Sequence, residues 1–204
     1  MKLDATRLYL VSPARIQAGA LADLVAELVA AGVDIIQLRE KEMEAGDLIR
    51  VGEPIRDACR TAGVPFLVND RPDVALALEA DGVHLGQNDL SAAVARRILG
   101  AKIVGTSTHE IEEIDDAMEE RPDYIAVGPV YETPTKPGRA PVGRELVAYA
   151  ARYATVPWFA IGGIDEKTLP EVMAAGARRA VVVRAITEAA DPVTAAARLR
   201  HALD

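Results

Sequence analysis

Eight short apolar segments alternate along this chain with eight longer segments of helical character. The apolar segments are rich in Val, Ile and Leu, and we predict strands at residues 7–12, 34–39, 65–70, 82–86, 103–107, 124–128, 158–162 and 179–184. The longer segments are rich in Ala, Leu, Glu and Arg, and we predict helices at residues 18–31, 45–62, 72–79, 91–99, 110–120, 143–153, 166–175 and 192–203. This alternation is typical of an α/β protein with a parallel sheet.

The predicted strands are continuous apolar runs, as expected for parallel strands that are covered on both faces. Several predicted helices are followed by a glycine, as a left-handed helix cap requires; these glycines are Gly32, Gly63, Gly100 and Gly176. Eight strand–helix units close most naturally into a (β/α)₈ TIM barrel, and no linker rich in Ser, Pro or Gly divides the chain. We therefore predict one α/β barrel domain over residues 1–204, with an open doubly wound sheet as the alternative.

The composition indicates a globular enzyme and argues against membrane spans. No apolar run approaches the roughly 18 residues that a membrane span needs, and the first residues lack the profile of a secretion signal. Cys59 is the single cysteine, which excludes an intrachain disulfide and fits a cytoplasmic location. The net charge of −8 argues against nucleic-acid binding. We expect small-molecule partners, and the sequence leaves open whether the chain forms a homo-oligomer.

Two predicted strands that follow each other along the chain end in acidic residues. Asp70 follows the third strand and Asp89 follows the fourth. If these strands are neighbours in a parallel sheet, both carboxylates open onto the same rim, where Mg²⁺ takes oxygen ligands from protein and phosphate. The alternative is that each Asp caps the next helix, where Pro72 is a typical first-turn residue. The pairing of the two carboxylates favours a metal site.

Basic side chains also gather where the predicted strands end. Gln37, Arg39 and Lys41 alternate along an extended segment, so all three can face the mouth of a barrel. Arginine binds phosphate oxygens with a forked donor and lysine acts as a point charge, which suits a diphosphate. The alternative is a strand end whose cations form ion pairs with Glu40 and Glu42.

Two later segments are candidates for a second phosphate region. Residues 133–139 form a long polar loop that is either a lid or a linker, and Thr135 and Lys136 offer it a hydroxyl and an ammonium group. Gly162 and Gly163, with the start of the eighth helical unit, can present bare backbone N–H groups to a phosphate, or form a simple turn. Arg71, Arg139 and Arg184 are further phosphate candidates because they also follow apolar runs.

The three histidines receive different interpretations. His84 lies inside a predicted strand and is expected to be a hydrogen-bonded core residue, whereas His201 on the last helix is expected at the surface. His109 follows a strand end and is open to either a structural or a catalytic role. No convincing Ser-His-Asp or Cys-His arrangement is present. The residues alone therefore indicate a Mg²⁺-assisted enzyme with two phosphate-binding regions.

Six motifs at predicted strand ends together resemble the thiamine-phosphate synthase family. They are Gln37-x-Arg39-x-Lys41, Asn69-Asp70-Arg71, Asp81-Gly-Val-His-Leu-Gly-Gln-x-Asp89, Gly105-x-Ser107-x-His109, Gly128-Pro129 followed by Thr133-x-Thr135-Lys136, and Ile161-Gly162-Gly163-Ile164. The resemblance extends from about Tyr9 to Ile186. It implies a (β/α)₈ barrel that joins hydroxymethylpyrimidine diphosphate to a thiazole phosphate and releases pyrophosphate and thiamine phosphate.

The resemblance also implies roles for individual residues. The pyrimidine diphosphate would be held by Gln37, Leu38, Arg39, Glu40, Lys41, Asn69, Ser107 and Lys136, among which Arg39, Lys41, Ser107 and Lys136 would be catalytic. Asp70 and Asp89 would be the Mg²⁺ ligands. The thiazole phosphate would be held by Thr133, Thr135, Gly163, Val183 and Arg184. The family pattern has serine where this chain has Arg184, so the phosphate contact there can come from a backbone N–H or from the guanidinium.

This chemistry agrees with the charged residues of the predicted mouth. Cations that neutralise a departing diphosphate allow the C–O bond to break first, and the thiazole nitrogen can then capture the pyrimidine cation without a protein nucleophile. Closure of residues 133–139 would keep water from the cation. A related thiazole tautomerase, with His109 as base, and a phosphate-ligand sensor without catalysis are the rival hypotheses, and neither needs Asp70 and Asp89.

Overall fold

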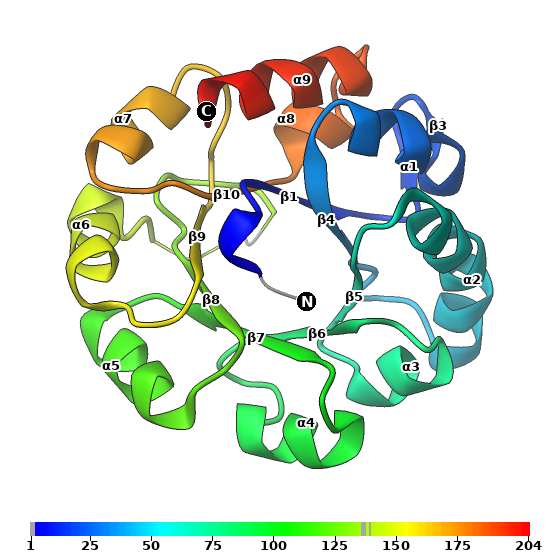
Figure 1. Cartoon of the computed structure of the whole chain (residues 1–204), viewed down its shortest axis with the longest axis horizontal. Helices are drawn as coiled ribbons and strands as arrows, with labels where there is room; N and C mark the ends of the chain where they lie inside the picture. The colour runs from blue at the N-terminus through cyan, green and yellow to red at the C-terminus, as the bar shows by residue number, and fades with distance from the viewer. Residues whose placement is uncertain (1–2, 136–137, 139) are drawn as a thin grey trace.

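The chain forms a closed barrel of eight parallel strands inside a ring of helices (Figure 1). The computed structural model describes residues 3–135, 138 and 140–204. The barrel strands are β1 (Leu8–Ser12), β4 (Val33–Leu38), β5 (Phe66–Asn69), β6 (Gly82–Leu85), β7 (Ile103–Thr108), β8 (Tyr124–Val127), β9 (Trp158–Ile161) and β10 (Ala180–Val182). They neighbour one another in chain order, and β1 pairs with both β4 and β10 to close the barrel. The predicted (β/α)₈ barrel is confirmed, and the open sheet is excluded.

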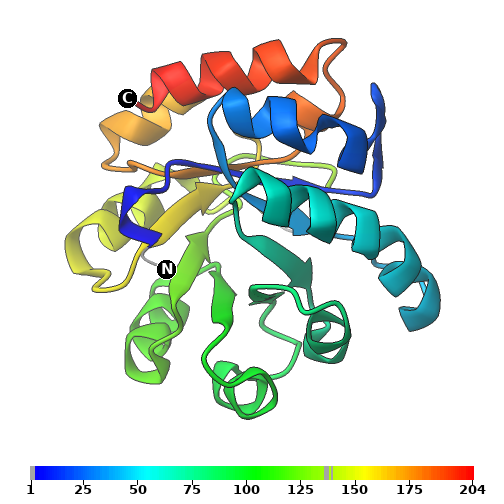
Figure 2. The same cartoon turned by 45° about the vertical axis from the view of Figure 1, so that its right-hand side comes forward.

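The helices pack around the outside of the barrel, as the turned view in Figure 2 also shows. They are α1 (Leu21–Ala30), α2 (Ala45–Ala62), α3 (Pro72–Ala77), α4 (Ala92–Leu99), α5 (Ile111–Glu120), α6 (Gly143–Tyr153), α7 (Leu169–Ala174), α8 (Arg184–Thr187) and α9 (Pro192–Ala202). Each predicted helix is present, with ends that differ by up to three residues. The four predicted cap glycines all have a positive φ, and Gly63 ends α2 in the left-handed conformation. Within the described residues, no helix is long and apolar enough to cross a membrane.

A two-stranded hairpin and two short helices were not predicted from the sequence. A two-stranded antiparallel hairpin, β2 (Arg15–Ile16) and β3 (Gly19–Ala20), precedes α1, so this helix begins at Leu21 and not at residue 18. The 3₁₀ helix η1 (Leu3–Ala5) precedes β1 and lies within the ring of strands in Figure 1. The short helix α8 follows β10 directly.

Apolar side chains fill the inside of the barrel as well as the layer between the strands and the helices. The rings of Tyr9, Tyr124 and Phe159 meet edge to face inside the barrel, with centroids 5.5–5.8 Å apart. Leu3 of η1 packs against this inner cluster and is only 5% exposed. The inside of the barrel is therefore a packed core at one end, and the opposite end, where the strands finish, remains available for a site.

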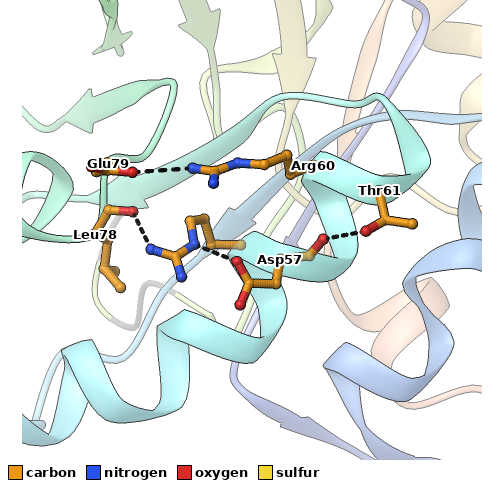
Figure 3. A network of polar contacts seen from close by, with 6 residues as sticks. Asp57, Arg60, Thr61, Leu78 and Glu79 are labelled. Atoms are coloured by element: carbon orange, nitrogen blue, oxygen red, sulfur yellow. Dashed lines mark hydrogen bonds and ion pairs between the residues drawn. The ribbon is translucent and has the colours of Figure 1, made fainter.

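Polar contacts join the end of α2 to the end of α3 on the outside of the barrel (Figure 3). Arg56 donates from Nη1 to the carbonyl oxygen of Leu78 at 3.1 Å and from Nε to Asp57 at 2.8 Å. Arg60 forms an ion pair with Glu79 at 3.3 Å. A guanidinium at the last carbonyls of α3 satisfies acceptors that have no partner within the helix. These contacts fix two neighbouring helical units, far from the mouth.

Cys59 is a structural residue of α2. Its side chain is fully buried, and burial together with the charge of Asp81 raises the pKa of the thiol to about 12. A thiol with so high a pKa stays protonated and is a poor nucleophile. The expectation that Cys59 packs within a helix is confirmed.

Candidate functional site

A cavity of about 550 Å³ opens at the carboxyl ends of the barrel strands. Its size is typical of a small-molecule site. Eight of the predicted site residues line it, and these are Gln37, Arg39, Asn69, Thr133, Thr135, Gly163, Val183 and Arg184. The closed barrel therefore brings the two predicted phosphate regions to one cavity.

The end of β4 and the residues after it send alternate side chains in different directions. Gln37 and Arg39 line the cavity, as their spacing predicts. Leu38 points the other way and packs in the outer core with no exposed surface, so only its backbone can serve a ligand. Glu40 also turns aside, because its Oε1 accepts a hydrogen bond from the N–H of Ala14 at 2.8 Å. The side chains of these two predicted binding residues hold the barrel and its first loop together.

Lys41 reaches across to the end of β5. Its Nζ lies 3.2 Å from Oδ2 of Asp70, so Lys41 pairs with a candidate metal ligand and not with Glu40 or Glu42, which was the alternative. Asp70 has a φ of 60°, in the left-handed region, which non-glycine residues rarely adopt. Its N–H donates to the carbonyl oxygen of His84 at 2.8 Å, which anchors the turn. Burial lowers the pKa of the nearby Arg39, and the negative charge of Asp70 opposes this shift only in part.

Asp70 and Asp89 lie together, as the strand order predicts. The carboxyl group of Asp89 is within hydrogen-bonding reach of Asp70, and its Oδ2 accepts from the N–H of Gly86 at 2.7 Å. Burial and the neighbouring Asp70 carboxyl group raise the pKa of Asp89. Two adjacent carboxyl groups are stabilised by a shared proton or by a nearby cation, and a metal ion can supply that charge. No third Asp, Glu, His or Cys completes a ligand group among the described residues, which suits Mg²⁺, an ion that keeps waters and substrate oxygens as ligands.

The alternative that these two acids cap helices is wrong. The residue before α3 is Arg71, which makes no capping contact through its side chain. Helix α4 is capped by Ser91, whose hydroxyl accepts from the N–H of Val94. Arg71 itself forms an ion pair with Asp73 at 2.5 Å on the outside, so it does not join the cavity as a phosphate candidate.

Ser107 and His84 form a hydrogen bond inside the barrel. Nε2 of His84 lies 2.9 Å from Oγ of Ser107, and Nδ1 lies 2.9 Å from the hydroxyl of Tyr124. The carbonyl oxygen of Ser107 accepts from Gln87 at 2.6 Å. The expectation that His84 is a hydrogen-bonded core histidine is confirmed. Ser107 is only 2% exposed and has a defined partner within the site.

His109 lines the cavity from the end of β7. Its Nδ1 pairs with the carbonyl oxygen of Gly128, and its N–H donates to Glu113 at 2.6 Å. Because a carbonyl oxygen only accepts, Nδ1 carries the hydrogen and the ring is held against the loop after β8. His201 is exposed on α9, as expected.

The second predicted phosphate region combines the end of β9 with the start of α8. Gly162 and Gly163 have φ values of 101° and 65°, and a Cβ on Gly163 would lie 2.6 Å from that of Tyr131. Only glycine fits this approach of backbone to backbone. Arg184 begins α8, and its Nε lies 2.8 Å from both carboxylate oxygens of Glu188. The ion pair with Glu188 raises the pKa of Arg184, and its guanidinium is held beside the cavity by this partner.

The loop after β8 borders the cavity through its described residues. Thr133 and Thr135 both line the cavity, and the N–H of Thr135 donates to Oγ1 of Thr133 at 3.3 Å. Lys136, Pro137 and Arg139 lie outside the described residues, so the predicted role of Lys136 and the lid remain predictions.

Three residues beside the site were not identified from the sequence. Tyr9 and Tyr124 lie within strands and have the pattern of ordinary core residues, yet their hydroxyls bond to each other and to site residues. Glu188 lines the cavity and pairs with Arg184. One signal was available in the sequence. A tyrosine that faces the inside of a closed barrel needs a polar partner for its hydroxyl group.

The chain is similar to known proteins along most of its length. The sequence model of the family described as thiamine monophosphate synthase matches residues 8–186. The thiamine-phosphate synthase of Mycolicibacterium vanbaalenii is 51% identical over 208 residues, covering 97% of this chain and 94% of the relative. The thiamine-phosphate synthase of Thermobifida fusca is 51% identical over 205 residues, covering 99% and 94%.

Solved structures show the same architecture. A thiamine phosphate pyrophosphorylase from Pyrococcus furiosus superposes with a TM-score of 0.88 at 31% identity, covering 97% of this chain and 95% of that one. A 3-hexulose-6-phosphate synthase has a TM-score of 0.67 at 23% identity, covering 98% and 100%, and shares the fold.

Proposed function

The chain belongs to the thiamine monophosphate synthase family and has the transferase activity of thiamine-phosphate synthases, and we propose that it works with Mg²⁺ through a dissociative reaction in the cavity at the barrel mouth. The substrates are hydroxymethylpyrimidine diphosphate and a thiazole phosphate, and the products are thiamine phosphate and pyrophosphate. The metal assignment rests on one observation: the carboxyl groups of Asp70 and Asp89 are adjacent. The cations Lys41 and Arg39 lie close to Asp70.

Asp70 and Asp89 would hold the ion. Burial and the neighbouring Asp70 carboxyl group raise the pKa of Asp89, while the charge of Lys41 partly offsets this rise, so a further cation at the pair would be favourable. Mg²⁺ bound there supplies charge neutralisation for the departing diphosphate. Lys41, now paired with Asp70 at 3.2 Å, is exposed over about half of its side chain and can turn to a diphosphate oxygen.

The diphosphate end of the cavity gathers donors for the leaving group. Arg39, Asn69 and His84 line the cavity, and Ser107 is hydrogen-bonded to His84. Positive and hydrogen-bonding groups that meet the charge as it grows on the leaving diphosphate lower the barrier to C–O cleavage. Lys136 is assigned to the same group by the sequence motif. Arg39, Lys41, Ser107 and Lys136 are therefore the proposed catalytic residues, and Gln37 with the Leu38 backbone and Glu40 completes the binding segment.

The reaction then needs no protein nucleophile. The aminopyrimidine stabilises the methylene cation that remains after diphosphate leaves, and the thiazole nitrogen captures it. Ala126, Ile161 and Val181 give the cavity apolar walls, which exclude water that would otherwise trap the cation. A reaction that needs no protein nucleophile has no use for a serine or cysteine triad.

The thiazole phosphate is assigned to the far end of the cavity. Thr133, Thr135 and Gly163 line it there together with Val183 and Arg184. Backbone N–H groups at Gly163 and at the start of α8 can approach phosphate oxygens without obstruction by side chains. Because the Arg184 guanidinium is paired with Glu188, we assign the main phosphate contact to the backbone.

The curated relatives disfavour the two rival functions. They carry the name thiamine-phosphate synthase, not that of a tautomerase or a sensor. A tautomerase also has no use for paired carboxylates, and a sensor has no use for charge neutralisation at a leaving group.

The first test is pyrophosphate release by the purified protein given hydroxymethylpyrimidine diphosphate, thiazole phosphate and Mg²⁺, with thiamine phosphate followed by mass. We expect both products in equal amounts, and neither after EDTA treatment. Adding Mg²⁺ back should restore turnover. Full activity in EDTA would remove the metal from the proposal, and binding of both substrates without products would favour the sensor.

A further inference from the structure

Five buried polar side chains cross the inside of the barrel in one unbroken series of hydrogen bonds. We call them the relay, and in order they are Gln37 of β4, Tyr9 of β1, Tyr124 of β8, His84 of β6 and Ser107 of β7. The three contacts between the tyrosines, the histidine and the serine are each 2.9 Å long. All five residues are at most 7% exposed. Two predicted substrate residues, Gln37 and Ser107, therefore stand at the two ends of one buried network.

The direction of the hydrogen bonds follows from counting hydrogens. The Gln37 amide donates from Nε2 to the Tyr9 hydroxyl, so the single hydrogen of Tyr9 is left to donate to Tyr124. The hydrogen of Tyr124 then goes to Nδ1 of His84. With Nδ1 as acceptor, a neutral His84 carries its hydrogen on Nε2 and donates it to Ser107.

With the Gln37 amide donating to Tyr9, the opposite direction leaves a buried hydrogen without an acceptor. If His84 donated from Nδ1, as the other tautomer or as a cation, Tyr124 would have to donate to Tyr9. Tyr9 would then accept from both Gln37 and Tyr124, and none of its contacts among the described residues would take its own hydrogen. An unsatisfied buried donor costs about 1–3 kcal/mol, so the orientation of the Gln37 amide selects the direction. If Oε1 faced Tyr9, the same series would run the other way.

We propose that the relay is directional, so that it holds His84 as the Nε2–H tautomer and leaves the hydroxyl hydrogen of Ser107 to donate to the substrate. The part of this inference that concerns substrate rests on the proposed function. Tyr9, Tyr124 and His84 are positioning residues, because they act through Ser107 and do not themselves transfer a group. The direction of the relay is a property of the protein without ligand.

Two features of the barrel support a fixed direction. Burial raises the pKa of both Tyr9 and Tyr124, so both phenols keep the hydrogen that the relay requires. Gly105 makes room for the Tyr124 ring, since a Cβ at this position would lie 2.5 Å from the Tyr124 hydroxyl and closer still to the ring. A side chain at residue 105 would push the hydroxyl out of line.

The relay gives Ser107 a defined task in the reaction. A serine that already accepts from His84 presents its hydrogen to a diphosphate or pyrimidine acceptor in the cavity. This donor strengthens as negative charge grows on the leaving group, and it needs no reorganisation because the relay has already oriented it. The expected effect of breaking the relay is therefore on kcat more than on KM.

The first experiment reads the tautomer directly. Protein labelled with ¹⁵N-histidine contains only three histidines, and His109→Gln and His201→Gln variants assign the ring signals of His84. We expect the two-bond ¹⁵N–¹H coupling pattern of an Nε2–H tautomer between pH 6 and pH 8, without substrate. An Nδ1–H pattern, or a doubly protonated ring, would overturn the direction whether or not the protein turns over.

The second experiment tests whether the relay acts through Ser107. Tyr124→Phe should lower kcat about 10-fold with KM changed less than about 2-fold, and His84 should lose its fixed tautomer. In a Ser107→Ala background, Tyr124→Phe should cause no further loss of kcat. Equal losses in both backgrounds would mean that Tyr124 acts only on structure, which would overturn the proposal.

The matched control is a tyrosine hydroxyl outside the barrel. Tyr149→Phe removes hydrogen bonds of 2.8 and 3.0 Å to Asp115 between α6 and α5, and kcat should be unchanged. Thermal unfolding of each variant shows whether it is folded. If the Tyr124 variant does not fold, the histidine spectrum of the unaltered protein still decides the direction.

Discussion

Asp70 combines three features at a single position of the site. Its backbone is left-handed, its carboxylate pairs with Lys41, and it lies beside Asp89. A left-handed residue other than glycine costs about 1 kcal/mol, and such strain gathers at functional sites because the surrounding structure holds it there. Asp and Asn tolerate this conformation better than other residues, because their side chains bond locally.

Because of this backbone strain, two substitutions of Asp70 should differ in their effect on stability. Asp70→Asn keeps a side chain suited to positive φ, whereas Asp70→Ala does not, so the Ala variant should be less stable by about 1 kcal/mol. Both should lose most Mg²⁺-dependent turnover, since neither has a carboxylate. Urea unfolding in EDTA gives the comparison, and equal stability of the two variants would mean that the left-handed backbone is not strained.

Ionised Asp89 is predicted to lower the stability of the metal-free folded protein, although its carboxylate serves the proposed metal site. Its pKa is raised in the folded protein, so the unfolded chain releases this proton first as pH rises, and stability falls between the unfolded and the folded pKa. Asp89→Asn removes that loss and should stabilise the metal-free protein by about 0.5 kcal/mol at pH 7, a small value because solvent screens the exposed pair. Turnover should fall on the order of 100-fold or more.

The measurement for Asp89 is chemical unfolding in EDTA at pH 4 and at pH 7, beside a Mg²⁺ assay. The gain in stability of the Asn variant should be larger at pH 7, where Asp89 is ionised, than at pH 4. A gain that does not change with pH would show that the ionisation of Asp89, disfavoured by burial and by Asp70, is not its cause.

At the residue scale, sequence reasoning located the mouth but not every side chain. Asp70 and Asp89 were predictable as neighbours because parallel strands bring their carboxyl ends to one rim. The directions of Leu38, Glu40 and Arg71 were not, because they depend on the rotation of a strand end and on local partners. Tyr9 and Tyr124 were missed because they are 115 residues apart and meet only when the barrel closes.

At the scale of elements, α2 carries an internal proline that offers a stability test. Pro54 lies in the middle of this 18-residue helix and is exposed, so it removes one backbone hydrogen bond without filling a core position. Pro54→Ala should raise the free energy of unfolding by about 1 kcal/mol. Alanine favours the helix by more than this, but it also gives the unfolded chain more conformational freedom, which reduces the gain. Turnover should be unchanged, because α2 lies outside the barrel.

The control for Pro54 is its exposed neighbour Glu53. Glu53→Ala leaves the helical hydrogen bonds intact and should change the free energy of unfolding by less than about 0.5 kcal/mol. Equal midpoints in urea for the Pro54 variant and the unaltered protein would indicate that the helix already accommodates the proline without loss.

The strong periodic elements were predictable and the short ones were not. The strands are buried on both faces and the long helices are amphipathic, so their patterns are clear from the sequence. The hairpin of β2 and β3 has two residues in each strand, too few for an alternating pattern, and it lies where a helix was predicted to start. Helix α8 has four residues, and its start depends on the end of β10.

At the scale of the whole molecule, the two ends of the barrel have different roles. The mouth carries the charged cavity, and the opposite end is filled by Leu3 of η1 against the inner core. Leu3→Ala should therefore lower the free energy of unfolding by about 2–3 kcal/mol. Turnover at a temperature where the variant is folded should stay within about 2-fold of the original.

Urea unfolding and an activity assay on the same samples measure this contrast. Asp4→Ala, in the same 3₁₀ helix but with an exposed side chain, is the matched control and should have little effect on either quantity. A large loss of activity in a fully folded Leu3 variant would mean that the two ends are coupled.

The pairing of β1 with β10 has a consequence for synthesis of the protein. The first strand to leave the ribosome hydrogen-bonds with the last, and β10 is only three residues long. Until that segment emerges, β1 and β9 are open sheet edges that can pair with other chains. The barrel of a nascent chain therefore stays unclosed, with β1 lacking one partner strand, until β10 has left the ribosome.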